Sequence, residues 1–336
     1  MNDVTSAILE RLYRAETRLS GEQLCREFGM SRSAIWKHIR QLRKSGCRID
    51  AVTGSGYRLK TISGTPVARE VALFLETRSF GRTLHYLHQT DSTNLSARKL
   101  ALEGVSEGTV VIADSQRSGR GRFGRPWVSP PGSNLYCSLI LRPPVISSRV
   151  PQITMLAALA IFRALHEASP ETEMGIKWPN DILVDTKKLC GVLSEMQSDS
   201  DMTHFVVVGI GININQEVFS EELRGKATSL FLETGSRFCR PKLLAGVLNR
   251  FEELYVEWLR EDDLGFIRQE IEHHSLLQGK PVTIDRVSGR LEGVVTGIAP
   301  GGELLLRSGE GKVHTVSSGE ATLRQDHCSL KSDSDL

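Results

Sequence analysis

The stretch SQRSGRGRFGRPWVSPPGSNLY, from Ser115 to Tyr136, contains four arginines, and in the segment GRGRFGR they alternate with glycines. Glycine has no Cβ atom, so the backbone N–H groups beside it can approach a ligand closely. Arginine adds a planar, permanently charged fork of donors. Because so much glycine disfavours a helix interior, the stretch predicts a mobile loop that binds an anion. We call residues 115–136 the arginine loop.

The segments on either side of the arginine loop decide where it belongs. An RG-rich disordered segment that binds RNA is one alternative. However, VVIAD (110–114) and NLYCSLILR (134–142) are continuous apolar runs typical of buried strands, which place the loop inside a folded domain. Further strands are expected at LHYLHQT, GIKWP, DILVD, LCGVLSEMQ and HFVVVGIGININ, with helices over 95–102 and within 151–169. The central part of the chain is therefore predicted to be an α/β domain.

The first sixty residues have a different pattern. Apolar residues at Ile8, Leu9, Leu12 and Tyr13 predict an amphipathic helix, and Ser20 with Gln23 forms a capping-box sequence for a second one. Gly29 supplies a turn, and Ser31 is expected to cap a third helix with Ala34, Ile35, Ile39 and Leu42 facing inward. CRIDAVTGSGYRLK then alternates as two strands around Gly54 and Gly56. This order predicts a winged helix-turn-helix.

The exposed face of the third helix suggests what this module binds. Its outward positions combine basic, hydroxyl and aromatic side chains: Ser31, Arg32, Ser33, Trp36, Lys37 and Arg40. A capped helix of this kind beside a glycine-rich wing favours DNA binding, although a protein-docking module with a solvated basic face is the alternative. The segment TISGTPVARE, from Thr61 to Glu70, mixes Gly, Pro and Thr and predicts a linker.

Length and composition set the broad class. The chain has 336 residues and a net charge of +2, which predicts two or three domains and allows nucleic-acid binding only as a local property. No apolar run is long enough to cross a membrane, and the start of the sequence lacks a signal-peptide core, so we expect a cytoplasmic protein with no membrane partner. The six cysteines show no metal-ligand spacing, so no metal ligand is predicted and reduced, packed thiols are expected.

Three polar segments of the central domain have a structural and a functional interpretation. Asp91, Ser92, Thr93 and Asn94 stand at an expected helix start, where capping alone would explain them. KWPND (177–181) is a strand that leads into a Pro-Asn-Asp turn. GIGIN (209–213) lacks the third glycine of a dinucleotide fingerprint and does not open a helix, so it gives little support to a Rossmann fold.

In their order along the chain, DSTN, the arginine loop, KWPNDILVDTKKLCGVLSEM and VVVGIGINI resemble the biotin–protein ligases. The leading winged helix resembles that of the bifunctional biotin ligase and biotin operon repressor of bacteria. The resemblance covers nearly the whole chain. It implies a class-II-synthetase-like α/β (α+β) core and an SH3-like β-barrel at the C-terminus, and the short strands and glycine-rich turns of 281–324 independently predict a small barrel. The expected domains are 1–64, 65–276 and 277–326.

The resemblance also implies a reaction. Biotin and ATP would form biotinyl-5′-AMP, from which biotin passes to a lysine of the biotin carboxyl carrier protein of acetyl-CoA carboxylase, while the same adenylate acts as corepressor. Arg122 and Lys188 are the implied catalytic residues, and Asp181 is a third candidate that would orient or deprotonate the lysine amine, with a turn-capping role as its alternative. Biotin contacts are implied for Ser92, Thr93, Asn94, Gln116, Arg120, Gly121, Arg122 and Lys188, and nucleotide contacts for Arg122, Arg125, Lys177 and Asn213. Lys187 offers the natural control for Lys188. At Phe123 the chain departs from the arginine-richest loops of the family, which suggests packing when the loop closes.

The use of ATP also makes Mg²⁺ an expected cofactor. The expected partners are the carrier protein, operator DNA of biotin genes and, on ligand binding, a second copy of the chain. Three alternatives stay open: a ligase without operator-specific repression, a regulator that keeps the pocket only as a sensor, and a lipoate-type ligase. The presence of both Arg122 and Lys188 favours chemistry over sensing, because sensing requires only binding.

Overall fold

The computed structural model describes residues 4–199, 202–286 and 289–323. Its N-terminal domain has three helices and a two-stranded antiparallel wing, which are α1 (Val4–Tyr13), α2 (Gly21–Phe28), α3 (Arg32–Lys44), β1 (Arg48–Val52) and β2 (Gly56–Thr61). Ser20 and Gln23 form the predicted capping box, and the Ser31 side chain accepts a hydrogen bond from the Ala34 amide. The predicted helix-turn-helix with a wing is confirmed.

The inward face of these helices forms a small separate core. Ile8, Leu9 and Leu12 are buried in it, together with the predicted inward residues Ile35, Ile39 and Leu42 of α3. Tyr13, the fourth apolar residue from which this helix was predicted, is not part of the core, because its side chain is 44% exposed. It lies at the last turn of α1, where its ring meets the edge of Phe74 in the next domain at a centroid distance of 5.4 Å.

The central domain is built on a seven-stranded mixed sheet in the order β3-β4-β5-β9-β8-β7-β6. Its strands are β3 (Leu84–Thr90), β4 (Val110–Gln116), β5 (Leu135–Leu141), β6 (Met174–Lys177), β7 (Asp181–Val184), β8 (Lys187–Asp199) and β9 (Met202–Ile212). β3 and β4 are parallel and the other pairs are antiparallel. The predicted strands of this domain are therefore present.

Helices cover both faces of this sheet. Two long helices, α6 (Val150–Ala168) and α8 (Arg240–Arg260), pack in one large core with the strand residues Val110 and Ile112. The alternate residue Val111 packs with α5 (Thr93–Leu102) in a second cluster, because successive strand residues point to opposite faces. Short helices complete the domain: α4 (Ala68–Val71), α7 (Leu230–Thr234) and α9 (Arg268–His273).

The C-terminal domain is a five-stranded antiparallel sheet in the order β13-β12-β11-β10-β14. Its strands are β10 (Pro281–Arg286), β11 (Gly289–Ile298), β12 (Leu304–Arg307), β13 (Val313–Val316) and β14 (Glu320–Leu323). The two edge strands, β13 and β14, do not pair with each other over residues 313–323, so the closed barrel predicted from the sequence is not seen. The five strands therefore form an open sheet with β13 and β14 at its two edges.

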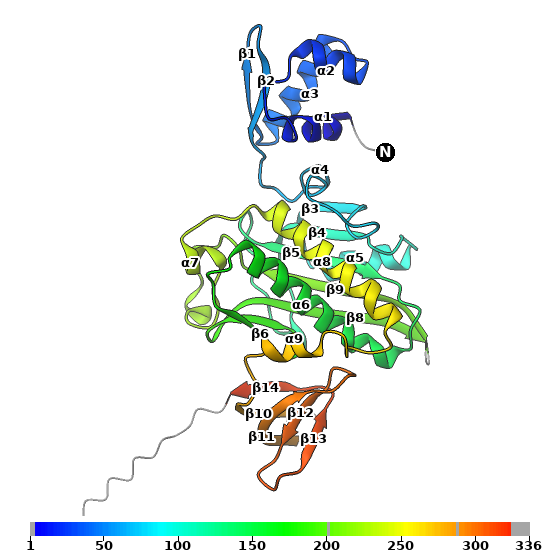
Figure 1. Cartoon of the computed structure of the whole chain (residues 1–336), viewed down its shortest axis with the longest axis vertical. Coiled ribbons are helices and arrows are strands. Elements are labelled where there is room, and N and C mark those ends of the chain that lie inside the picture. The colour runs from blue at the N-terminus through cyan, green and yellow to red at the C-terminus, as the bar shows by residue number, and fades with distance from the viewer. Residues whose placement is uncertain (1–3, 200–201, 287–288, 324–336) are drawn as a thin grey trace, which may run out of the picture.

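The two small domains lie at opposite ends of the central domain (Figure 1). The expected domain limits fall between β2 and α4 and between α9 and β10, while the expected end at residue 326 lies outside the described residues. No described helix is long and apolar enough to cross a membrane. Five cysteines are free thiols, and burial raises the pKa of Cys137 to about 12. The sixth, Cys328, also lies outside the described residues.

Candidate functional site

A cavity of about 360 Å³ opens on the face of the central sheet where α5 begins. It is bounded by the start of α5, the arginine loop, the β6–β7 turn, strands β8 and β9, and the start of β14. The eleven residues predicted to contact biotin or the nucleotide, and the predicted catalytic residue Asp181, all line it: Ser92, Thr93, Asn94, Gln116, Arg120, Gly121, Arg122, Arg125, Lys177, Asp181, Lys188 and Asn213. The structure therefore brings these residues together, whereas what each one binds stays a prediction.

Around the start of α5 the cavity is lined by neutral hydrogen-bonding groups. The Gln116 side-chain oxygen accepts from the Thr93 amide at 2.9 Å, and its amide nitrogen donates to Ser129 Oγ at 2.9 Å. Ser92 is the N-cap residue of α5, but its side chain makes no capping hydrogen bond. Capping therefore does not account for Ser92, and its hydroxyl group is available to a ligand.

Asn94 also lines this part of the cavity, but its side chain is hydrogen-bonded within the protein. Its amide nitrogen donates to Glu195 Oε2 at 2.6 Å and to the Leu193 carbonyl at 3.3 Å. Its side-chain oxygen lies 2.6 Å from Ser138 Oγ. Because these partners occupy the Asn94 amide group, its contribution to the cavity is a fixed wall rather than a free donor.

The floor of the cavity depends on glycines in β8 and β9. A Cβ atom on Gly211 would lie 2.6 Å from the Trp127 ring, and one on Gly209 would lie 2.2 Å from Asn94 Oδ1. A Cβ atom on Gly191 would lie 2.9 Å from the Lys188 side chain. The glycines of GIGIN thus permit close side-chain packing, which is a different role from the phosphate contact of a dinucleotide fingerprint.

Trp127 is a cavity residue that the sequence analysis missed. Its ring lies on this glycine floor, and its buried indole N–H has no hydrogen-bond partner within the described part of the chain. A buried donor without a partner is costly, so this N–H is suited to an acceptor on a ligand. The signal in the sequence was a tryptophan inside a glycine-rich loop.

Arg122 and Arg125 attach the arginine loop to other segments. Arg122 donates to Asn180 Oδ1 at 3.1 Å and to the Gly319 carbonyl at 3.2 Å, and burial lowers the pKa of its guanidinium group. Arg125 forms a two-point ion pair with Glu320. Hydrogen bonding to Arg125 lowers the pKa of Glu320. The C-terminal domain therefore holds the loop through Gly319 and Glu320, neither of which sequence reasoning had selected.

The two neighbouring lysines of β8 have different partners. Lys188 Nζ lies 2.8 Å from Asp181 Oδ1 inside the cavity, and 5.4 Å from the centre of the Trp127 ring. Lys187 instead pairs with Glu233 at 3.2 Å and does not line the cavity. The pair Lys188–Asp181 places a cation and a carboxylate together at the point where the sequence predicted catalysis.

The cavity has a marked excess of positive charge. Six cationic side chains line it, which are Arg120, Arg122, Arg125, Lys177, Lys188 and Lys226, against two carboxylates, Asp181 and Glu320. The whole chain has a net charge of only +2. Charge of one sign inside a concave site raises the local concentration of ligands of the opposite sign, so the cavity suits a ligand that carries an anionic group.

Phe123 is exposed on the arginine loop in this structure. Its side chain is 69% exposed, and its backbone has a φ of 57°. The guanidinium groups of Arg122 and Arg125 lie 5.1 and 5.9 Å from the centre of its ring. The expected packing belongs to a closed loop, and this structure leaves it untested.

The predicted DNA-contacting residues share one face of α3. Ser31, Arg32, Ser33, Trp36, Lys37 and Arg40 are all exposed. The Arg40 guanidinium lies 5.3 Å from the centre of the Trp36 ring, and Trp36 is 50% exposed. The opposite face of α3 is buried, which leaves this basic face as the accessible surface of the helix.

Comparisons with known proteins agree with this arrangement. Residues 86–213 match the biotin/lipoate A/B protein ligase family, residues 4–58 an HTH domain, and residues 278–324 the biotin protein ligase C-terminal domain. The chain is 39% identical to the bifunctional ligase/repressor BirA of Bacillus subtilis over 87% of this chain and 90% of that protein. It is 34% identical to the biotin–[acetyl-CoA-carboxylase] ligase of Paracoccus denitrificans, over 67% of this chain and 95% of that protein.

A solved structure of a biotin protein ligase matches most of this fold. The biotin protein ligase of Aquifex aeolicus, solved in complex with biotin and ATP, matches with a TM-score of 0.63 and 34% identity. The match covers 73% of this chain and 99% of that one.

Proposed function

Because the chain belongs to the biotin protein ligase family, and to its bifunctional ligase/repressor members, we propose that it activates biotin with ATP and transfers it to a carrier protein. The intermediate is biotinyl-5′-AMP, and the acceptor is a lysine of the biotin carboxyl carrier protein of acetyl-CoA carboxylase. Through its winged helix the chain also represses the genes of biotin biosynthesis.

The observation that carries this proposal is that two chemically different sets of residues line one cavity. Ser92, Thr93 and Gln116 offer hydroxyl and amide groups, as the neutral ureido ring of biotin requires. The six cationic residues suit phosphate groups. A ligand with a neutral polar head, an apolar chain and a charged tail matches this distribution.

The first step joins two groups of like charge. A carboxylate oxygen of biotin attacks the α-phosphorus of ATP, a P–O bond forms, and the bond to pyrophosphate breaks. Arg122 and Lys188 lie where they can screen the carboxylate and the phosphate from each other. Preorganised cations in a site from which water is excluded stabilise the charge that develops in the transition state.

The second step consumes the mixed anhydride. The carrier lysine attacks the carbonyl carbon, an amide bond forms, and AMP leaves with the electron pair of the broken C–O bond. The attacking amine must lose a proton, and we assign its acceptance or orientation to Asp181, the carboxylate next to Lys188. Asn180 accepts from Arg122 and thereby positions it for the first step.

We propose that Mg²⁺ accompanies ATP rather than occupying a site of its own. Within the described residues no group of three or more His, Cys, Asp or Glu side chains is arranged to hold a metal ion. The two carboxylates of the cavity are paired with Lys188 and Arg125. Mg²⁺ is commonly held by substrate phosphates with few protein ligands, and its contribution when bound would be charge neutralisation.

We also propose which fold families the central and C-terminal domains resemble. The mixed sheet with helices on both faces supports a class-II-synthetase-like core. The five short strands of the C-terminal sheet support an open variant of an SH3-like barrel.

A mass-spectrometric assay tests the enzyme. The acceptor is an isolated biotin carboxyl carrier domain, incubated with the full chain, ATP and either biotin or lipoate. We expect a biotin adduct on one lysine and no lipoate adduct. Modification by lipoate alone would favour the lipoate-type alternative, and binding of biotin without any adduct would favour a sensor.

For repression we propose biotinyl-5′-AMP as the corepressor. Closing the arginine loop on the adenylate would order a surface of the protein, and an ordered surface loses less entropy when a second copy docks. Two winged helices would then contact two half-sites. Sedimentation with and without biotinyl-5′-AMP tests this step, and identical dimerisation under both conditions would leave a ligase with an uncoupled DNA-binding domain.

A further inference from the structure

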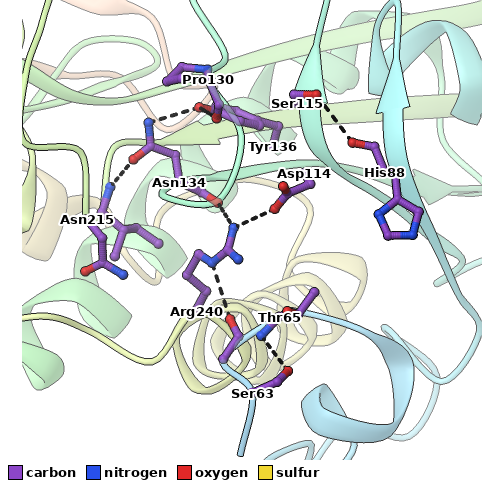
Figure 2. Close-up of polar contacts among 12 residues, drawn as sticks. Ser63, Thr65, His88, Asp114, Ser115, Pro130, Asn134, Tyr136, Asn215 and Arg240 are labelled. Carbon is purple, nitrogen blue, oxygen red and sulfur yellow. Dashed lines mark hydrogen bonds and ion pairs between the residues drawn. The ribbon is translucent and has the colours of Figure 1, made fainter. Parts of the chain in front are cut away.

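Arg240 is the first residue of α8 and lies at the junction of three segments (Figure 2). Its side chain is 8% exposed. The Nε atom donates to the Gly64 carbonyl at 3.3 Å. The Nη1 atom donates to Asp114 Oδ1 at 3.0 Å and to the Asn134 carbonyl at 3.2 Å. One rigid guanidinium group thus joins the linker of the winged helix to two segments of the central sheet.

The linker is also fixed on its other side, by Glu70 of α4. This carboxylate is fully buried and accepts from the Ser63 amide at 3.1 Å and from the Gly64 amide at 2.9 Å. The Cys47 thiol of the winged-helix domain lies 3.7 Å from the same carboxylate. Gly64 is therefore held at both of its backbone polar groups, its N–H by Glu70 and its carbonyl by Arg240.

The other contacts of Arg240 lead to the ligand cavity. Asn134 ends the irregular part of the arginine loop, and its side-chain oxygen accepts from the Ile214 amide at 2.8 Å (Figure 2). Ile214 follows the cavity residue Asn213. Asp114 precedes the cavity residue Gln116 by two positions on β4. Asp114, which Arg240 contacts, thus lies two residues from a cavity residue. Ile214, which is hydrogen-bonded to the second Arg240 partner Asn134, lies one residue from another.

We propose that Arg240 is a positioning residue that couples the occupied cavity to the linker carrying the winged helix. The proposal rests on the proposed function, because the ligand that moves the arginine loop is the adenylate. When the loop orders, the Asn134 carbonyl is fixed, and the guanidinium group that it shares with Gly64 becomes fixed with it. The coupling must be reciprocal, so a disturbed linker also alters the cavity wall.

Hydrogen–deuterium exchange of the full chain, with and without biotin and ATP, tests the coupling. In the parent protein we expect the Ser63 and Gly64 amides to exchange at least about 5-fold more slowly with the ligands. In Arg240→Lys this ligand-dependent change should be lost, because an ammonium group cannot reach all three acceptors in the same geometry. The matched control is Arg237→Lys, since Arg237 is three residues earlier, is exposed, and contacts Glu217 and the Phe231 ring rather than the linker or Asp114.

A second variant covers the case in which Arg240→Lys does not fold. Gly64 has a φ of +78°, and a Cβ atom there would have no neighbour within 4 Å. Gly64→Ala therefore strains only the backbone of the linker. Without any ligand, we expect the Ile214 amide, on the far side of Arg240, to exchange faster in this variant than in the parent protein.

Pyrophosphate release is measured on the same samples. If the parent protein releases pyrophosphate but its linker exchange is unchanged by the ligands, or if Arg240→Lys keeps the full ligand-dependent change, the coupling is overturned and the ligase stands. If no pyrophosphate forms, the proposed function is overturned. The coupling is then decided by Gly64→Ala, and an unchanged Ile214 exchange rate in that variant overturns it.

Discussion

Arg122 contacts the C-terminal domain and Arg240 contacts the linker to the winged helix, and the structure holds the two side chains in different ways. Arg240 forms an ion pair with Asp114 and donates to two carbonyl groups. Among the described residues Arg122 forms no ion pair and donates to the neutral oxygens of Asn180 and Gly319, and burial lowers its pKa. The charge of Arg240 is compensated by the fold, whereas that of Arg122 is available to an anion. By this difference we distinguish Arg240, which connects segments of the fold, from Arg122, which we expect to bind the ligand.

Lys188 is the sharpest test of this comparison, because it lies in the cavity yet has a carboxylate partner, Asp181. If Lys188 acts in the transition state, Lys188→Ala should lower kcat/KM for pyrophosphate release by about 10²- to 10³-fold. Lys187→Ala removes only a half-exposed ion pair with Glu233 and should change it less than about 3-fold. Equal losses in the two variants would remove the case for Lys188.

Arg122→Gly should release the intermediate rather than prevent its formation. The variant loses the cation that faces the phosphate, so biotinyl-5′-AMP should dissociate about 10- to 100-fold faster, as expected for one charge-assisted contact. Arg117→Gly is the control in the same loop, because Arg117 pairs with Asp91 and does not line the cavity. An Arg122→Gly protein that retains the adenylate as long as its parent would contradict the assigned role.

Glu252 of α8 is a carboxylate that only supports the fold. It accepts from the amides of Arg78, Ser79 and Phe80. Burial alone would raise its pKa, but these backbone N–H groups lower it below the usual 4.5. We therefore expect Glu252→Gln to lower the free energy of unfolding by about 1–3 kcal/mol at pH 7.

The pH dependence of this loss follows from the direction of the shift. A lowered native pKa adds stability above the unfolded pKa, and this stability is lost as the pH falls through the native pKa. The difference between the parent protein and Glu252→Gln in urea titrations should therefore shrink below about pH 4.5. Glu253→Gln, which alters only an exposed pair with Arg250, should show neither the loss nor this trend.

The smallest expected effect is a gain in stability. Gly246 lies inside α8, and a Cβ atom there would meet Ala164 at an ordinary 3.6 Å. Gly246→Ala should therefore raise the free energy of unfolding by about 0.5–1 kcal/mol, measured by denaturant titration. Gly235 ends α7 with a φ of 72°, so Gly235→Ala should act in the opposite direction. A loss in Gly246→Ala would mean that α6 and α8 pack too tightly for one methyl group.

The predictions from sequence succeeded where neighbours along the chain decide the structure. Apolar runs indicated the strands of the central sheet, and the Ser20 and Ser31 caps located α2 and α3. The sequence did not reveal the pairing of Arg125 with Glu320, which lie 195 residues apart. Nor did it reveal that the Asn94 amide group is occupied by Glu195 and Ser138. Such contacts form only when separate strands come together, so no local pattern encodes them.

The closed barrel was the expectation that the structure did not support, and its reason is similar. Short alternating strands indicate that a small sheet forms, but closure depends on how its first and last strands meet in space. Here β13 and β14 remain the edges of the sheet over residues 313–323. β14 instead places Glu320 against the arginine loop.

The central claim is that the cationic residues of the cavity promote a reaction between biotin and ATP rather than merely binding them. Native mass spectrometry of the full chain after incubation with biotin and ATP tests this claim most directly. We predict one major species, the chain carrying biotinyl-5′-AMP, and its strong depletion in Lys188→Ala but not in Lys187→Ala. A chain that carries biotin and ATP as separate, unreacted ligands would contradict the account.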